Sequence, residues 1–132
     1  MTTTDNPLKV LIVEDDSQLA EYLTDFIDDY DASILVQVAD NGLGALDYLK
    51  DHRVDIIIMD LMMPGMDGIE LCRQVKLMTH TCEIPIIAMT GYPAMENIDR
   101  VIEAGASAFM GKPLEPETLR AILRDLSHGR KI

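Results

Sequence analysis

Short apolar runs rich in β-branched residues alternate with longer amphipathic segments, and this alternation constrains the fold more than any other feature. The runs predict five strands, at residues 9–13, 34–39, 54–59, 85–89 and 108–111. The segments between and after them predict five helices, at residues 17–29, 42–51, 67–78, 93–104 and 116–127. Strands that each lead into a helix form a parallel sheet with helices on both faces. We therefore expect one α/β domain over residues 8–127, with short tails at 1–7 and 128–132.

Local signals support several helix boundaries. The candidate N-terminal caps are Asp16 or Ser17, Asp40 or Asn41, and Asp67. Pro116 fits the first turn of the last helix, and Gly105 follows the fourth helix where a left-handed residue is favoured. In that fourth helix, Ile98, Val101 and Ile102 are expected on the buried face.

Composition narrows the possible partners. The 132 residues include 11 basic and 23 acidic side chains, for a net charge of −12. This balance argues against nucleic acid or an anionic membrane as a direct partner. The N-terminus has no basic start followed by an apolar core, and no apolar run is long enough to cross a bilayer, so we expect a cytoplasmic domain.

The cysteines and histidines give little evidence for a metal or redox site. Cys72 and Cys82 form neither a CxxC pair nor a disulfide framework, which favours two reduced thiols. His80 and Cys82 are close in sequence, but two candidate ligands do not define a zinc site.

Charged and polar residues follow the strands at their carboxyl ends, where ligands bind in open α/β sheets. They are Glu14, Asp15 and Asp16 after the first strand, Asp60 after the third, Thr90 after the fourth and Lys112 after the fifth. If the first and third strands are neighbours, their carboxylates meet. Two carboxylates about 5 Å apart repel by roughly 3 kcal/mol at an effective dielectric of about 20. Such a cluster favours a bound cation, and its oxygen ligands suit Mg²⁺.

This set of groups could support phosphoryl transfer. The Asp60 carboxylate could attack phosphorus and form an acyl phosphate, while Mg²⁺ and Lys112 compensate negative charge. Each residue also has a simpler interpretation: Asp16 and Asp67 as helix caps, Thr90 as a strand-end residue, and Lys112 as a surface lysine. The hypothesis depends on all of them meeting at one edge of the sheet.

The motifs "VLIVEDD", "DIIIMDLMMPGMDG", "PIIAMTG" and "GASAFMGKP" occur in an order and spacing that resemble the receiver domain of two-component response regulators. The resemblance covers about residues 8–127. It implies a flavodoxin-like, doubly wound (βα)5 fold with five parallel strands in the order 2-1-3-4-5.

The resemblance also implies a metal and phosphorylation site. Asp60 matches the phosphoacceptor and a metal ligand. Asp15 matches a direct Mg²⁺ ligand, Glu14 a ligand acting through water, and Met62 a ligand through its backbone carbonyl. Mn²⁺ could replace Mg²⁺.

Four further positions match other residues of the family's site. Thr90 and Lys112 match the switch hydroxyl and the lysine that contacts the phosphoryl group. Phe109 occupies the position of the switch aromatic residue, and Pro113 is expected to follow a cis peptide bond.

Two residues near the site are expected to tune the lifetime of the acyl phosphate. Met62 and Tyr92 stand where relatives often carry polar residues that orient the hydrolytic water, so we expect slow self-dephosphorylation. Met62, Met63 and Met66 lie in one loop, which either docks the phosphodonor or packs over the third helix.

The resemblance predicts a signalling switch rather than an enzyme. The expected donor is a histidine kinase or a histidine phosphotransfer protein. The surface of the fourth helix, fifth strand and fifth helix would change to control an unknown partner or a fused output domain, with the domain a monomer or a weak dimer on phosphorylation. The alternatives are a Mg²⁺-dependent aspartyl-phosphate hydrolase, a nucleotide- or flavin-binding module, and a degenerate receiver used only for docking.

Overall fold

The computed structural model describes residues 7–91, 95–112 and 114–129. Along these residues run five strands: β1 (Lys9–Val13), β2 (Leu35–Ala39), β3 (Ile56–Asp60), β4 (Ile86–Thr90) and β5 (Ala108–Gly111). The helices that alternate with them are α1 (Ser17–Tyr30), α2 (Gly42–Asp51), α3 (Gly68–Leu77), α4 (Met95–Glu103) and α5 (Pro116–Ser127). None of these helices is long and apolar enough to cross a bilayer.

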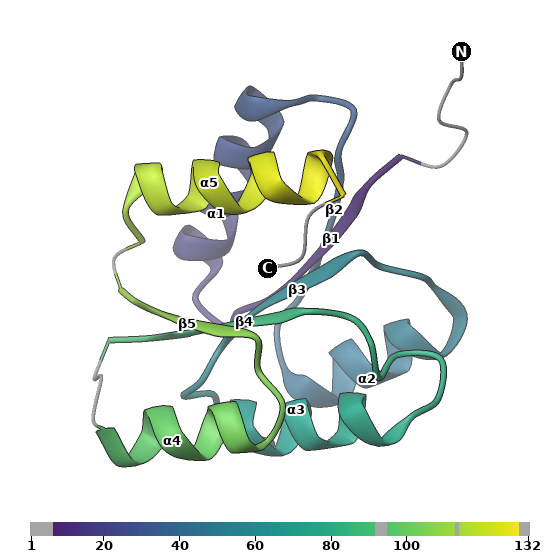
Figure 1. Ribbon diagram of the computed structural model, residues 1–132, viewed down its shortest axis with the longest axis vertical. Helices are drawn as coiled ribbons and strands as arrows, with labels where there is room; N and C mark the ends of the chain where they lie inside the picture. Colours follow the sequence, from purple (N-terminus) through teal and green to yellow (C-terminus); the bar gives the residue numbers. More distant parts are fainter. Residues whose placement is uncertain (1–6, 92–94, 113, 130–132) are drawn as a thin grey trace.

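The strands form one parallel sheet in the order β2-β1-β3-β4-β5. Helices α1 and α5 cover one face of the sheet, and α2, α3 and α4 cover the other (Figure 1). This is the doubly wound, flavodoxin-like architecture, so the expected fold class and strand order are confirmed.

Two apolar layers, one on each face of the sheet, make up the core. Leu11 and Met59 belong to the layer on the α2, α3 and α4 side, which also contains Cys72. Ile12 and Ile58 belong to the layer on the α1 and α5 side. Side chains alternate across a strand, so β1 and β3 are buried on both faces. All five residues of β3 are buried, in keeping with its position between β1 and β4.

The helix caps are resolved by the structure. Asp16, rather than Ser17, caps α1 by accepting hydrogen bonds from two backbone N–H groups of the first turn. Asn41, rather than Asp40, caps α2, and Asp67 caps α3. These side chains satisfy N–H groups that have no partner within their own helices.

Some boundaries and one buried face differ from the prediction. Strands β3 and β4 begin one or two residues later than expected, and each extends one residue further, to Asp60 and Thr90. Helix α4 is described from Met95, and its predicted start at residue 93 lies outside the described residues. Val101 is buried, but Ile102 is 44% exposed, since consecutive residues lie about 100° apart around a helix and Ile102 lies beside the buried face of α4.

Candidate functional site

The sheet topology brings the acidic residues of two separate segments together. Strand β1 lies beside β3, with Val13 opposite Met59. The next residue on each strand is therefore a carboxylate, Glu14 or Asp60, and both stand at the same edge of the sheet. Backbone bonds fix these positions, since Glu14 N donates to Ala39 O at 3.0 Å and Leu61 N donates to a β4 carbonyl at 2.8 Å.

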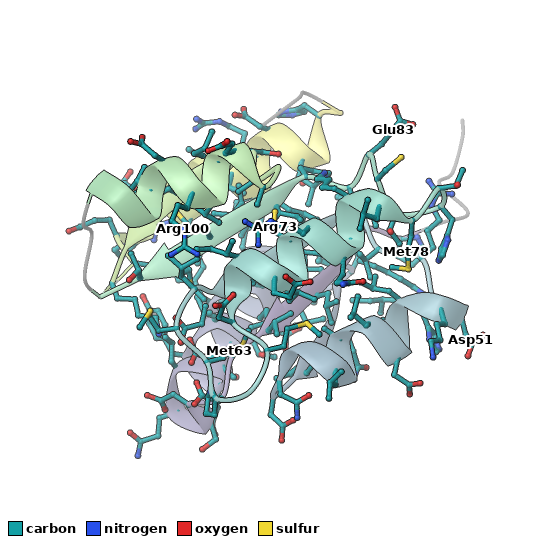
Figure 2. All side chains as sticks on the ribbon, turned by 90° about the horizontal axis from the view of Figure 1, so that it is seen from below. Asp51, Met63, Arg73, Met78, Glu83 and Arg100 are labelled. Atoms are coloured by element: carbon teal, nitrogen blue, oxygen red, sulfur yellow. The ribbon has the colours of Figure 1, made fainter. Side chains whose placement is uncertain are left out.

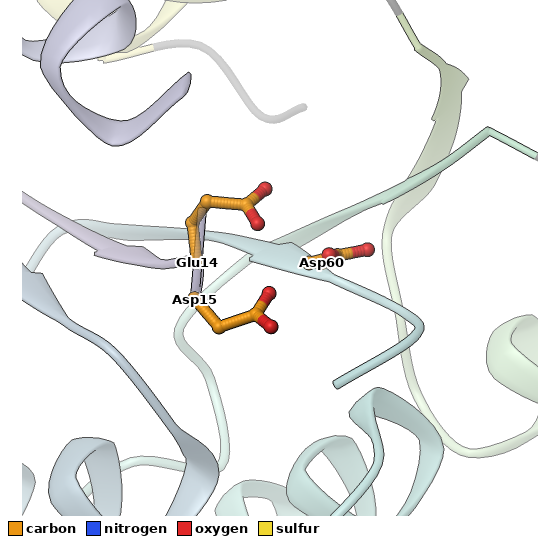
Figure 3. A group of neighbouring side chains, drawn as sticks. All are labelled: Glu14, Asp15 and Asp60. Carbon is orange, nitrogen blue, oxygen red and sulfur yellow. The ribbon is translucent and has the colours of Figure 1, made fainter. Parts of the chain in front are cut away.

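Three carboxylates converge at this edge. Glu14, Asp15 and Asp60 each offer one oxygen, and these oxygens lie within 4.8 Å of one another. Figure 3 shows the side chains of Glu14 and Asp15 both directed toward Asp60. Glu14 and Asp60 are buried, whereas Asp15 is exposed. The predicted meeting of the first and third strand ends is confirmed.

Lys112 connects two of these carboxylates. Its Nζ lies 3.0 Å from Asp60 Oδ2 and 3.0 Å from Glu14 Oε1. The backbone of Lys112 is held by β4, because its N–H donates to Thr90 O at 2.8 Å. One ammonium group therefore lies between two buried carboxylates and offsets only one negative charge, and Asp15 adds a further negative charge beside them.

The charges of Glu14 and Lys112 are strongly influenced by burial. Burial raises the pKa of Glu14, and the charge of Asp60 adds to this, whereas the hydrogen bond from the Asp16 N–H and the ion pair with Lys112 act in the opposite direction. Burial alone would lower the pKa of Lys112, but its contacts with Glu14 and Asp60 outweigh that effect and raise it. Lys112 therefore stays positively charged. The three carboxylates still leave the site with excess negative charge, which favours the binding of a further cation.

Backbone N–H groups orient the two buried carboxylates. Met62 N donates to Asp60 Oδ1 at 3.1 Å, and Asp16 N donates to Glu14 Oε2 at 3.1 Å. Each of these carboxylates thus has one oxygen held by the main chain and the other held by Lys112. This fixed arrangement presents the acids to a common point without large side-chain motion.

Gly68 allows α3 to begin directly against the end of β3. Its N–H donates to Leu61 O at 2.9 Å. A Cβ atom at this position would lie 2.8 Å from the carbonyl oxygen of Asp60 and 2.8 Å from Leu61 Cα. Any side chain would therefore push α3 away from the residue that carries the central carboxylate, a requirement that our sequence analysis did not identify.

Thr90 and Phe109 lie on neighbouring strands near the same end of the sheet. Thr90 is buried and pairs with Gly111, while Phe109 is half-buried and pairs with Ala88. Paired residues in a ladder point to the same side, and residues two apart share a face, so Thr90 and Phe109 face the same side of the sheet. Tyr92 and Pro113, which we expected to tune the site and to follow a cis bond, fall outside the described residues.

The three methionines of the loop between β3 and α3 have different environments. Met63 is buried in the core layer, and Met66 is partly buried against it. Met62 is 59% exposed next to Asp60. The structure therefore supports a packing role for Met63 and Met66 and leaves Met62 as the exposed methionine of this loop. Figure 2 shows Met63 on the face of the molecule covered by α2, α3 and α4.

The donor set fits a hard divalent cation. Carboxylate oxygens are the ligands that Mg²⁺ prefers, and one or two carboxylates with water usually suffice to bind it. Glu14, Asp15 and Asp60 offer three such groups in one place. Asp15 is exposed and is the most accessible of them.

The sequence model of the response regulator receiver domain matches residues 10–124 of this chain. That match covers most of the sequence, and the chain therefore belongs to the response regulator receiver domain family. Proteins of this family bind Mg²⁺ at an acidic pocket, and response regulators take their phosphoryl group from histidine kinases. The chain is a regulatory domain rather than a conventional enzyme.

Individual relatives agree with this assignment. The chain is 36% identical over 121 residues to the heme response regulator HssR of Staphylococcus epidermidis, covering 89% of this chain and 52% of the relative. It is 33% identical over 124 residues to the transcriptional regulatory protein BaeR of Escherichia coli, covering 92% of this chain and 49% of the relative. The chain thus spans about half the length of these curated relatives.

Solved structures show the same fold. The signal receiver domain of a DNA-binding response regulator from Colwellia psychrerythraea superposes with a TM-score of 0.87 at 35% identity, covering 92% of this chain and 98% of that one. The chemotaxis response regulator CheY4 of Vibrio cholerae gives 0.82 at 30% identity, covering 92% and 99%.

Proposed function

We propose that this domain is a phosphorylation-activated switch in which Asp60 accepts a phosphoryl group from a histidine kinase or a histidine phosphotransfer protein. The observation that carries this proposal is the convergence of Glu14, Asp15 and Asp60, with Lys112 bridging two of them. A buried carboxylate with a bridging lysine and nearby acids suits phosphoryl transfer better than it suits folding stability.

In the proposed reaction, a carboxylate oxygen of Asp60 attacks the phosphorus of a phosphohistidine. A new O–P bond forms, the N–P bond breaks, and its electron pair returns to the imidazole nitrogen. Mg²⁺ bound at the acidic group would neutralise negative charge on the carboxylates and on the incoming phosphoryl oxygens. We assign Asp15 and Asp60 as direct ligands, Glu14 as a ligand through water, and the Met62 carbonyl as a further ligand; Mn²⁺ could serve in its place.

Lys112 and Thr90 would then contact the phosphoryl group. The ammonium group of Lys112 already lies 3.0 Å from Asp60, so it can contact a phosphoryl oxygen with little movement. The Thr90 hydroxyl would turn toward another oxygen. Phe109 would move into the space released, and the surface of α4, β5 and α5 would change shape.

The lifetime of the phosphorylated state forms a separate part of the proposal. Met62 is 59% exposed beside Asp60 and has no group that could orient a hydrolytic water. With Tyr92 as the other flanking residue, we expect slow self-dephosphorylation. A hydrolase that forms an aspartyl phosphate needs an acid or base beside its nucleophile, and the apolar Met62 disfavours that alternative.

The partners and setting follow from the same chemistry. The phosphoryl group of the proposed phosphohistidine donor comes from ATP, so we expect the domain to act in the cytoplasm. The output is a separate protein or a domain joined to the receiver, and the domain acts as a monomer or a weak dimer when phosphorylated.

The direct test is phosphorylation by acetyl phosphate with Mg²⁺, followed by intact-mass spectrometry. We expect the wild-type chain to gain one phosphoryl group, and Asp60→Asn to gain none. Asp28→Asn, which neutralises an exposed acid on α1, is the matched control and should react normally. Label that persists on another acid of Asp60→Asn contradicts the assignment.

The lifetime is tested by the decay of the acyl phosphate after the donor is removed. Met62→Asn introduces a polar side chain at the exposed position beside Asp60 and should speed the decay about tenfold, an effect of about 1.4 kcal/mol on the barrier. Met66→Asn in the same loop is the control. Equal decay rates for the wild type and Met62→Asn contradict this account.

A further inference from the structure

Strand β2 is an outer strand of the sheet, and part of its backbone faces away from β1. Leu35 N donates to the carbonyl just before β1 at 2.8 Å, and Ala39 O accepts from the N–H just after β1 at 3.0 Å. These two residues therefore face β1. Because backbone groups alternate in direction along a strand, Val36 and Val38 direct their N–H and C=O groups to the open side.

The open side is only lightly covered by the described chain. Gln37 Nε2 donates to the Val38 carbonyl at 3.3 Å, and this bond is exposed to solvent. A long bond of this kind from an exposed side chain contributes little and is easily replaced. The edge is thus accessible to another strand.

The side chains of β2 do not protect this edge. Its sequence, Leu-Val-Gln-Val-Ala, contains no charge, no proline and no glycine, which are the usual devices that prevent strand pairing at an edge. Leu35 is 47% exposed and Val38 is 37% exposed, and they lie on opposite faces of the strand. An added strand would therefore find apolar contacts on both faces as well as backbone partners.

Acidic clefts flank this edge on both faces. A cleft of 620 Å³ lies on the α2 side, and a cleft of 430 Å³ lies on the α1 side. No lysine or arginine of the described chain lines either cleft. Outside the phosphorylation site, their acidic residues are Glu21, Asp25, Asp40, Asp47 and Asp51.

We propose that the β2 edge binds an extended segment of a partner protein, which adds to the sheet as a sixth strand and carries lysine or arginine side chains between apolar ones. Backbone hydrogen bonds to Val36 and Val38 supply the pairing. Side chains of the added strand alternate between the two faces, so basic residues reach the acidic cleft on each side.

The charge of the edge disfavours a second copy of this chain as the occupant. Pairing of two β2 edges would bring the acidic clefts of both molecules together, in chains that each carry a net charge of −12. The proposal concerns a surface formed by the unmodified fold, so it stands whether or not Asp60 accepts phosphate.

The test uses the full chain, labelled with ¹⁵N, and an eight-residue peptide of alternating lysine and valine as the probe. We expect saturable amide shifts and slowed hydrogen exchange at Val36 and Val38. Two control peptides should fail to bind: one with glutamate in place of lysine, and one with alternate backbone nitrogens methylated along one edge. Equal binding of the methylated peptide, or shifts confined to residues away from β2, overturns the proposal.

Two double variants distinguish the effect of the acids in the clefts from the effect of net charge alone. Asp47→Asn/Asp51→Asn removes two acids from the α2-side cleft and should weaken peptide binding about fivefold. Asp28→Asn/Asp29→Asn removes the same charge from exposed α1 positions outside both clefts, and it should change binding less than twofold. Equal weakening by the two variants overturns the assignment to the clefts. Concentration-dependent shifts at Val36 and Val38 without any peptide would instead identify a second copy as the occupant and overturn the basic partner.

Discussion

Strands β2 and β3 have similar sequences but very different environments. Both are five-residue runs of mainly aliphatic side chains, Leu35–Ala39 and Ile56–Asp60. Every residue of β3 is buried, whereas no residue of β2 is fully buried. The difference comes from position in the sheet, since β3 lies between β1 and β4 and β2 has a described neighbour on one side only.

The comparison indicates which strand suits a fixed chemical group and which suits contact with another chain. A central strand is held by strands on both sides and by helices on both faces, so it can carry a buried carboxylate, Asp60, in a fixed position. An outer strand keeps free backbone groups and exposed apolar side chains, which suits reversible contact with another chain. The four predictions below test this contrast, beginning with the largest effect.

Hydrogen exchange should separate the two strands most clearly. The amides of Ile57 and Ile58 should exchange only through global unfolding, at a free energy of about 5 kcal/mol or more. The outward amides of Val36 and Val38 should exchange through local fluctuations at close to 0 kcal/mol. Exchange followed by NMR in D₂O measures both, and similar protection of the two strands would remove the basis of the comparison.

Truncation of one side chain in each strand should give unequal losses of stability. Ile58 is fully buried, and Ile58→Ala should lower the free energy of unfolding by about 3 kcal/mol, because it leaves a cavity in the core. Val38 is 37% exposed, and Val38→Ala should cost about 0.5 kcal/mol. Urea denaturation followed by circular dichroism measures both changes, and equal losses contradict the assigned environments.

Substitution of two lysines allows the buried charges at the end of β3 to be compared with the exposed charges near β2. Lys112→Ala leaves Glu14 and Asp60 without their cation and should cost about 2 kcal/mol without Mg²⁺, and added Mg²⁺ should recover part of this. Lys50→Ala breaks a 3.9 Å pair with Asp47 in which both side chains are largely exposed, so it should cost less than about 0.5 kcal/mol. Thermal unfolding with Mg²⁺ and with EDTA measures these effects. A Lys112→Ala variant as stable as the wild type in EDTA contradicts the proposed charge balance.

The smallest effect concerns Cys72, which packs in the core layer beside β3. Burial raises the pKa of its thiol from 9.0 to about 11. Between these values the unfolded chain loses this proton more readily than the folded chain, so the free energy of unfolding should fall as pH rises from 9 to 10. The expected fall is about 1 kcal/mol. Urea titrations of the wild type and of Cys72→Ala at both pH values isolate this contribution, and an equal pH dependence of the two proteins argues against a dry environment for the thiol.

The sequence predicted the fold well because its local and global signals agree. Alternating apolar runs and amphipathic segments predicted every described strand and helix to within about two residues. The convergence of Glu14, Asp15 and Asp60 was also predictable, because parallel strands end at one edge of the sheet. The exposure of Ile102 was missed, since a run of apolar residues does not show which one faces the sheet.

Other parts of the site could not be read from the sequence, because they depend on distances between separate segments. Nothing in the sequence indicates that Lys112 pairs with Glu14 as well as Asp60. The need for glycine at position 68 also depends on how closely α3 approaches the end of β3. These contacts join residues far apart in the chain, so local sequence patterns do not predict them.

The order of residues along the chain was enough to specify the kind of fold, the family and the acids that meet at one edge of the sheet. The three-dimensional packing alone settled how one lysine is shared between two carboxylates and how closely α3 approaches the end of β3. The reason is that side-chain periodicity and capping act over a few neighbouring residues, whereas burial and charge balance depend on which segments become neighbours in space.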